Sequence, residues 1–321
     1  MSPVSGRELD PARALEAARQ GDRGALARLV SLVEAGGPPA RRLAALTFPL
    51  AEGSYSVGVT GPPGAGKSTL TDGLIAKARE AGHQVGVLAV DPTSPVSGGA
   101  LLGDRVRMQR HAEDEAVFIR SMASRGHRGG LAAAVPETIR LLAAAGMDLV
   151  LVETVGVGQV EVEVASTTDS TVVVVNPGWG DAVQVSKAGL LELADLFVVN
   201  KSDRPGVEEA VRELSSMLDL SRPGGWRPPI LATVASRGEG LEAVWEELEK
   251  HRAFLEGEGE LARRRQERLL TELRAALSEL IDARISSAFG GELVESVKAE
   301  MAAGRLDPGA AARRIADALA S

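Results

Sequence analysis

The chain has 321 residues, 44% of them hydrophobic and 25% charged, which is enough for one large core of ~200 residues with additional helices. Its formal net charge of −8 argues against a nucleic-acid-binding protein, because affinity for a phosphate backbone depends on a basic surface. The sequence has no cysteine, which excludes disulfides, thiolate metal sites and a cysteine nucleophile.

Nothing in the sequence is typical of a membrane protein. No apolar run approaches the ~18 residues that span a bilayer, and residues 2–19 are charged and helical in pattern, unlike a signal peptide. We therefore expect a cytoplasmic protein that binds neither membranes nor nucleic acids.

The first part of the chain is expected to be helical. Apolar residues between Pro11 and Glu34 recur at helical spacing, and this pattern predicts one or two amphipathic helices. We assign residues 1–45 to an N-terminal helical extension.

Short runs of β-branched residues alternate with helical patterns over residues 46–256. Apolar strands in such an alternation are typical of a mostly parallel sheet covered by helices on both faces. The predicted strands are Val57–Thr60, Val85–Val90, Leu149–Glu153, Thr171–Val175, Leu196–Val199 and Ile230–Thr233. The predicted helices are Lys67–Ala81, Leu131–Ala145, Gln184–Ala194, Val207–Leu218 and Leu241–Leu255. The fold class is therefore α/β, and ligand-binding groups should gather at the carboxyl ends of the strands.

A glycine-rich loop, G-P-P-G-A-G-K-S, follows the first predicted strand and precedes a helical pattern. Its glycines let successive backbone N–H groups surround a phosphate at a helix N-terminus, where the helix dipole favours anions. Lys67 would reach the β- and γ-phosphates, and the Ser68 hydroxyl would ligate Mg²⁺. The loop thus predicts a P-loop NTPase. The predicted nucleotide-binding residues of this loop are Gly61, Pro62, Pro63, Gly64, Ala65, Gly66, Lys67, Ser68 and Thr69.

The tetrapeptide Asn200-Lys201-Ser202-Asp203, after another apolar strand, indicates which base is bound. The Asp203 carboxylate can accept from guanine N1–H and N2–H₂ together, while Lys201 lies over the ring. Adenine lacks these two donors, so ATP would leave a buried carboxylate unpaired at a cost of about 1–3 kcal/mol. GTP and GDP are therefore the expected nucleotides. A weaker signal at Thr233, Ala235 and Ser236 adds a backbone N–H for guanine O6.

Carboxylates at the ends of other strands are candidates for a metal site. Glu153 opens the sequence E-T-V-G and takes the position of aspartate in the D-x-x-G motif of GTPases, with one methylene more. Asp91 and Asp104 are expected near the same end of the sheet, and hard oxygen ligands suit Mg²⁺. The predicted metal ligands are Ser68, Asp91, Asp104 and Glu153.

The candidate catalytic residues are Lys67, Glu153, Gly156 and Gln159. Gly156 would donate its N–H to the γ-phosphate, so that its loop is held with GTP and released after hydrolysis. A fast GTPase needs a water-positioning glutamine and an arginine finger. Here Val157 follows Gly156 where that glutamine usually stands, and Gln159 comes two residues later. We expect slow intrinsic turnover that a partner accelerates. The arginines considered as fingers in cis are Arg105, Arg107 and Arg110, although a charged helix face is the simpler role for them.

The last part of the chain, residues 257–321, is expected to be helical again. After a break at residues 257–259, the pattern predicts one long charged helix from Glu260 to about Ile285 and two shorter helices. An apolar stripe between Leu269 and Ile281 has helical spacing. It fits equally well with packing inside its own domain and with a dimer interface.

Together these motifs resemble the MeaB family, P-loop GTPases that act as chaperones of adenosylcobalamin-dependent acyl-CoA mutases such as methylmalonyl-CoA mutase. The resemblance covers nearly the whole chain and is most specific at residues 153–159, E-T-V-G-V-G-Q. It implies a Mg²⁺·GTP site and homodimerisation through the C-terminal helices. It also implies a switch loop at residues 176–181 that couples the nucleotide state to the mutase. The implied function is to gate cofactor loading and to protect the mutase. Further matching stretches are residues 61–68, 91–95, 98–99, 102–105, 120–126, 129–130, 200–203 and 233–236.

Other functions remain open. Nickel-insertion GTPases have a similar core but carry cysteine or histidine clusters, whereas this chain has no cysteine and its four histidines share no metal-ligand spacing. An ATP-dependent kinase is disfavoured by Asn200–Asp203, and no general base is paired with an acceptor site. A binding switch without meaningful turnover is left open by Val157.

Overall fold

A computed structural model describes residues 9–92, 109–111, 113–124, 130–154, 166–178, 193–219, 225–288 and 292–320. The chain divides into two compact units, Met1–Arg268 and Leu269–Ser321.

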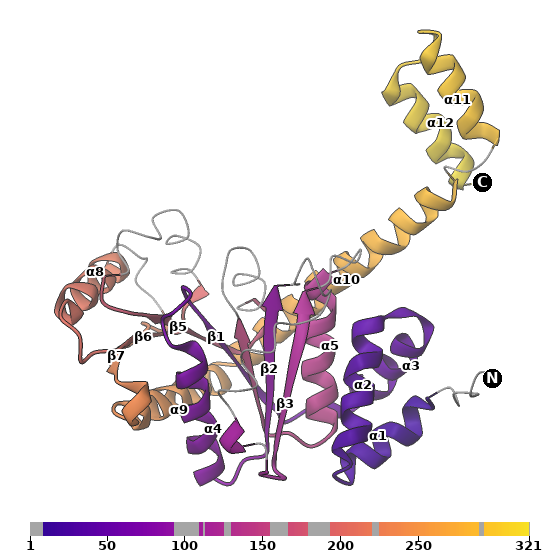
Figure 1. The fold of residues 1–321 in the computed structure, drawn as a ribbon. Coiled ribbons are helices and arrows are strands. Elements are labelled where there is room, and N and C mark those ends of the chain that lie inside the picture. Colours follow the sequence, from indigo (N-terminus) through magenta and orange to yellow (C-terminus); the bar gives the residue numbers. More distant parts are fainter. Residues whose placement is uncertain are drawn as a thin grey trace, which may run out of the picture. The chain divides into compact units, whose positions relative to one another are not determined.

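The first unit is built around a parallel sheet that has seven strands in the described part of the chain (Figure 1). The order is β3-β2-β4-β1-β5-β6-β7, so β1 lies at the centre. The strands are β1 (Tyr55–Thr60), β2 (Val85–Pro92), β3 (Val117–Ser124), β4 (Leu149–Thr154), β5 (Ser170–Val175), β6 (Leu196–Asn200) and β7 (Ile230–Thr233). This topology confirms the predicted α/β fold of a P-loop NTPase. Because all strands run the same way, the loops after β1, β4, β6 and β7 emerge at one edge of the sheet, the carboxyl edge.

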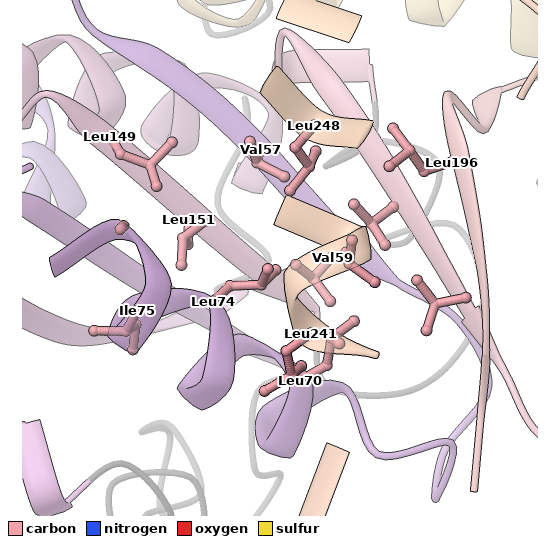
Figure 2. Packing of buried hydrophobic residues seen from close by; sticks show 14 of the residues in the cluster. Val57, Val59, Leu70, Leu74, Ile75, Leu149, Leu151, Leu196, Leu241 and Leu248 are labelled. Atoms are coloured by element: carbon pink, nitrogen blue, oxygen red, sulfur yellow. The ribbon is translucent and has the colours of Figure 1, made fainter. Parts of the chain in front are cut away.

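Helices cover both faces of this sheet. On one face, β1 packs against α4 and α9, where Val57 and Val59 meet Leu74 and Leu248 (Figure 2). On the other face, α5 and the N-terminal helices share a second core. The helices of this unit are α1 (Pro11–Arg19), α2 (Arg23–Ala35), α3 (Gly37–Thr47), α4 (Lys67–Glu80), α5 (Gly130–Ala144), α8 (Val207–Asp219) and α9 (Leu241–Gly257). Fully buried strands such as β1, β4, β5 and β6 are what a parallel sheet covered twice requires.

Helices α4 and α9 approach each other closely at a glycine. A Cβ atom on Gly73 of α4 would lie 2.4 Å from Cδ1 of Leu241, the first residue of α9. Any side chain at position 73 would therefore require Leu241 to change its side-chain conformation or the two helices to move apart.

Two elements of this unit were not predicted. Helix α3 begins with Pro38 and Pro39, which usually break helices but are tolerated in the first turn. The edge strand β3 mixes polar and apolar residues, so its sequence lacks a clear strand pattern. On β3, Arg120 pairs with Glu34 of α2 at 3.0 Å, which attaches the N-terminal helices to this side of the sheet.

The opposite, amino edge of the sheet buries charged groups. Asp169, just before β5, is 2% exposed and accepts the backbone N–H of Ser56 at 3.0 Å. It pairs with Arg265 at 2.7 Å and also with Arg268, both on α10 (Glu260–Ala288). Burial alone would raise the pKa of Asp169, but the hydrogen bonds and charges of the two arginines outweigh it and hold this pKa below its usual value.

A second chain of polar contacts runs beside Asp169. Asp195, before β6, lies 3.0 Å from Arg264 and 3.2 Å from His251, which is fully buried. His251 Nδ1 is 2.6 Å from Ser170 Oγ, which is 2.6 Å from the Tyr55 hydroxyl. Burial raises the pKa of Tyr55. The network ties the starts of β1, β5 and β6 to the start of α10.

The second unit contains the rest of α10, α11 (Glu292–Ala302) and α12 (Pro308–Ala320). Val294 and Val297 on α11 and Ala311 on α12 are buried, and Arg314 pairs with Glu300 at 3.0 Å. The apolar stripe of α10 is exposed: Leu269, Leu270, Leu273, Leu277, Leu280, Ile281 and Ile285.

No helix in the described residues combines the length and the hydropathy that crossing a bilayer requires.

Candidate nucleotide site

The loop between β1 and α4 has a backbone that only glycine can supply. Gly61 and Gly66 have φ angles of 132° and 98°, in the region that favours glycine. A Cβ on Gly61 would lie 2.0 Å from the carbonyl oxygen of Val174, and one on Gly66 would lie 2.2 Å from Nδ2 of Asn200. Gly61 and Gly66 therefore allow the loop after β1 to pass close to β5 and to the end of β6.

This loop leads directly into α4, whose first residues are Lys67 and Ser68. Both are buried, at 6% and 4% exposure. Lys67 Nζ donates to the carbonyl oxygens of Gly61 at 2.6 Å and Pro62 at 3.2 Å, so the lysine head lies within the loop itself. The ammonium group and the helix N-terminus concentrate positive potential where a phosphate group would bind.

Glu153 lies beside the loop because β4 is the neighbour of β1, with Val59 opposite Glu153. The glutamate is 1% exposed, and its Oε1 accepts from Ser68 Oγ at 2.6 Å. A hydroxyl and a carboxylate that converge at the carboxyl edge are the hard oxygen donors that Mg²⁺ prefers, so these residues fit the predicted metal.

The other predicted metal ligands are less well defined. Asp91 belongs to the end of β2, but its side chain lies outside what the structure describes, and so does Asp104. The predicted catalytic residues Gly156 and Gln159, and part of the predicted switch loop, residues 179–181, also lie outside the described residues.

Asn200, at the end of β6, joins the three loops of the predicted site. Its Nδ2 donates to the carbonyl oxygen of Ala65 at 2.8 Å. Its Oδ1 accepts from the Thr233 hydroxyl and from the Ala235 N–H, both at 3.1 Å. The loop of residues 61–68, the phosphate loop, is thus fixed to the two loops that were predicted to bind the base. These base loops are residues 200–203 and 233–236. The Ala235 N–H, considered for guanine O6, is used in this connection.

Lys201 follows with a φ of 59°, the only positive value at a non-glycine residue in the described ranges. Such a conformation is uncommon outside glycine, asparagine and aspartate. It lets the side chain turn back over the phosphate loop, where Nζ donates to the Gly64 carbonyl at 2.6 Å. The Ser202 N–H donates to the Thr233 carbonyl at 3.0 Å, which holds the turn.

The side chain of Asp203 is 37% exposed and not buried as predicted, and its Oδ2 lies 3.2 Å from Nη2 of Arg237. Arg237 ends a short 3-10 turn, η4 (Ala235–Arg237), which also contains the predicted Ser236. Arg237 is not among the predicted site residues. Arg237 is a basic residue in the loop after β7. Only the pairing of β7 with β6 brings this loop next to Asp203, so the sequence alone does not connect the two residues.

Arg110, one of the arginines considered as a finger, is engaged elsewhere. Its Nε lies 2.8 Å from Oδ1 of Asp72 on α4, and its Nη2 donates to the Asp72 carbonyl at 2.9 Å. His111 Nε2 lies 3.1 Å from the same carboxylate. In this arrangement Arg110 fastens η2 (Gln109–His111) to the helix that follows the phosphate loop.

Comparisons with known proteins identify the family and the fold of the chain. The chain matches the family model described as "Methylmalonyl Co-A mutase-associated GTPase MeaB" over residues 26–289. A protein of Pyrococcus abyssi named as a putative GTPase is 48% identical over 305 residues, which cover 94% of each chain. The mouse (Mus musculus) protein named "Methylmalonic aciduria type A homolog, mitochondrial" is 37% identical, over 84% of this chain and 66% of its own. A crystal structure described as an LAO/AO transport system kinase has a TM-score of 0.73 at 28% identity, covering 98% of this chain and 100% of that one.

Proposed function

Because this chain belongs to the MeaB family of P-loop GTPases, we propose that it is a GTP-driven chaperone of an adenosylcobalamin-dependent acyl-CoA mutase of the methylmalonyl-CoA mutase type. GTP hydrolysis follows from the family. The client is a proposal, supported by the description of the family model and by the name of the mouse relative. In this role the protein gates cofactor loading and protects the mutase.

The observation that carries the proposal is the convergence at the carboxyl edge. Ser68 lies 2.6 Å from Glu153, and Asn200 connects the phosphate loop to the base loops. These contacts link the phosphate, metal and base regions into one unit. A nucleotide bound across them would be sensed by the loop that follows Glu153.

We assign the binding roles as follows. Lys67 and the backbone N–H groups of residues 61–69 bind the β- and γ-phosphates, while Lys201 and Asp203 bind the guanine. Ser68 and Glu153, with Asp91 and Asp104, would hold Mg²⁺. When bound, Mg²⁺ would offset the negative charge of the phosphates.

Competition between nucleotides tests this assignment. We expect GTP and GDP to displace a fluorescent guanine nucleotide, and ATP at equal concentration to have little effect, because adenine lacks the donors that Asp203 accepts. Displacement by ATP as effective as by GTP would instead favour an ATP-dependent kinase.

The catalytic cycle is proposed to be slow without the client. Gly156 binds the γ-phosphate, Gln159 is the candidate to position water, and residues 176–181 carry the nucleotide state to the mutase surface. Hydrolysis of GTP should therefore be measured with and without a purified mutase of this type. We expect acceleration by the mutase. An isolated chain that already turns over several times per second would contradict the proposal.

The client itself can be tested by co-purification with the mutase in GTP and in GDP. We expect the amount of complex to depend on the nucleotide. Equal absence of the complex in both states would argue against the chaperone role. Tight nickel binding in equilibrium dialysis would then favour a nickel-insertion GTPase, against which the absence of cysteine and the scattered positions of the four histidines argue.

We further propose that residues 257–321 mediate homodimerisation through the exposed stripe of α10. Leu273 is 62% exposed and Leu280 is 65% exposed, and a contiguous apolar surface of this kind is typical of an interaction site. Light scattering should give a dimer for the unmodified chain and a monomer for Leu273→Glu. Glu279→Ala, on the opposite face of the same helix, is the matched control and should stay dimeric. A monomeric unmodified chain would contradict this proposal without affecting the nucleotide site.

A further inference from the structure

We propose that Arg237 is a specificity-determining residue for the base, because its guanidinium positions the Asp203 carboxylate for guanine. The inference rests on the proposed function, since it assumes that Asp203 reads the base. It adds a residue that lies outside both the N-K-x-D sequence and the phosphate loop.

The contact joins two loops from neighbouring strands. Asp203 follows β6, and Arg237 follows β7, which pairs with β6 in parallel. Nη2 of Arg237 lies 3.2 Å from Oδ2 of Asp203, and the two side chains are 59% and 37% exposed. This single contact uses one of about four lone-pair directions of the carboxylate. Guanine needs two of the others, so the arginine and the base can be accommodated together.

The backbone fixes the place of Arg237. Its N–H donates to the Val234 carbonyl at 2.8 Å, and the Val234 N–H donates to the Glu239 carbonyl at 3.1 Å. Gly238, with a φ of 77°, closes this turn. Nη1 of Arg237 lies 3.8 Å from Glu239, so the guanidinium is held between two carboxylates.

The same turn is tied to the rest of the site. Ala235, two residues before Arg237, donates its N–H to Asn200 at 3.1 Å. The base loops and the phosphate loop therefore set the position of the arginine together. A carboxylate that is held before the ligand arrives loses less side-chain entropy on binding, which is how pre-organisation increases affinity.

A competing interpretation is that Arg237 imitates the N–H groups of guanine and must leave when the base binds. An arginine in that role would engage both carboxylate oxygens with its planar fork, as bidentate arginine–carboxylate pairs do. The contact here involves one oxygen of Asp203. The geometry therefore favours positioning over competition, and the two interpretations predict opposite changes in affinity.

The test measures binding of GTP and inosine triphosphate to the full chain and to Arg237→Ala and Arg237→Lys. Inosine keeps N1–H but lacks the 2-amino group, so it uses one of the two contacts to Asp203. We expect Arg237→Ala to weaken GTP binding about two- to fivefold, the range of a partly exposed ion pair, and to narrow the preference for GTP over inosine triphosphate. The rate of hydrolysis at saturating GTP should not change, and Arg237→Lys should restore part of the affinity.

Arg227→Ala is the matched control, because Arg227 also forms an exposed pair, with Asp219 at 2.6 Å, near the amino edge. This variant should bind GTP like the unmodified chain. Unchanged or tighter GTP binding in Arg237→Ala would overturn the proposal, and so would an equal loss in Arg227→Ala.

A variant that already lacks the Asp203 carboxylate distinguishes positioning of Asp203 from direct contact of Arg237 with the nucleotide. In a chain that already carries Asp203→Ala, adding Arg237→Ala should cause no further loss of GTP affinity. The same loss in both backgrounds would show that Arg237 acts without Asp203 and would overturn the positioning role. If the unmodified chain binds ATP as tightly as GTP, the proposed function fails. If it prefers GTP while Arg237→Ala changes nothing, only this inference fails.

Discussion

The two edges of the central sheet bury charged groups in different ways. At the amino edge, Asp169 is surrounded by Arg265, Arg268 and the backbone of Ser56, all supplied by the chain itself. At the carboxyl edge, Lys67 and Ser68 lie at the start of a helix, next to a loop in which Gly61 and Gly66 leave no space for a side chain. One edge is a closed ion-pair network, and the other is shaped as a binding site.

This comparison teaches that a buried charge does not by itself identify a functional site. The amino edge contains more ion pairs, yet its arrangement explains attachment of α10 rather than chemistry. The carboxyl edge is distinguished by its backbone, with positive φ angles at Gly61, Gly64 and Gly66 and a helix N-terminus. Substitutions should therefore affect activity at one edge and stability at the other.

The largest effect is expected from Lys67→Ala at the carboxyl edge. Removing the ammonium group from the phosphate site should lower GTP hydrolysis by about 10²–10³-fold, the cost of losing one charge-stabilising group. The free energy of unfolding should change by no more than about 1 kcal/mol. Lys77→Ala is the control, because Lys77 lies on the same helix and pairs with Glu80 and Glu242. An active Lys67→Ala variant would break the comparison.

At the amino edge, Asp169→Ala should lower stability and leave GTP affinity almost unchanged. Removing the carboxylate leaves two arginines without it, which should cost about 3 kcal/mol of unfolding free energy, at the low end because both arginines keep some contact with water. Urea denaturation measures this, and GTP affinity of the folded protein should stay within about twofold, as for a site outside the binding region. Asp219→Ala removes an exposed carboxylate and should change little. A loss of GTP binding in Asp169→Ala without a loss of stability would contradict the distinction between the two edges.

A backbone substitution sharpens the comparison further. Gly66→Ala introduces a Cβ at a φ of 98° and 2.2 Å from Asn200, so it should cost about 1–3 kcal/mol and also weaken nucleotide binding. Gly82→Ala is the matched control, because Gly82 has a φ of 88° but no atom within 4 Å of the added Cβ. Gly82→Ala should be destabilised by a similar backbone strain, but its affinity for nucleotide should not change. Equal nucleotide affinity in the two variants would mean that the contact between Gly66 and Asn200 does not shape the site.

The smallest expected effect is on the stability of the protein at low pH. The pKa of Asp169 is held below its usual value, so the stability from its ion pairs is fully present above the ordinary aspartate pKa of about 3.9 and is lost as the pH falls through the lower folded value. Urea denaturation between about pH 6 and about pH 3 should show a component of acid destabilisation that Asp169→Asn lacks. Parallel pH profiles for the two proteins would assign the acid sensitivity to other carboxylates.

Much of the fold could be predicted because local patterns determine it. The buried strands β1, β2, β4, β5 and β6 and helices α4, α8 and α9 were predicted to within a few residues, since a strand buried on both faces is almost entirely apolar. The edge strand β3 was missed, because an edge strand that contains Arg120 and Ser121 lacks this composition. Helix α3 was missed because its prolines indicate a break, although they stand in its first turn.

The candidate site was predictable to the extent that its residues are adjacent in sequence. The phosphate loop and Asn200–Asp203 are short contiguous motifs, and the structure brings them together through Asn200. Pairs such as Asp203 with Arg237, or Asp169 with Arg265, join residues that are far apart in the chain. Their meeting depends on strand order and on the start of α10, which no local pattern contains. The roles of the site residues remain predictions.

The close crossing at Gly73 has a consequence for how this protein tolerates change. Leu241, which touches the space that a methyl group at position 73 would fill, begins α9 immediately after the turn that carries Arg237. Displacing that helix would also move the turn that carries Arg237. A substitution at Gly73 that moves α9 is therefore expected to disturb the proposed base-binding turn, although Gly73 lies in the hydrophobic interior and outside the motifs.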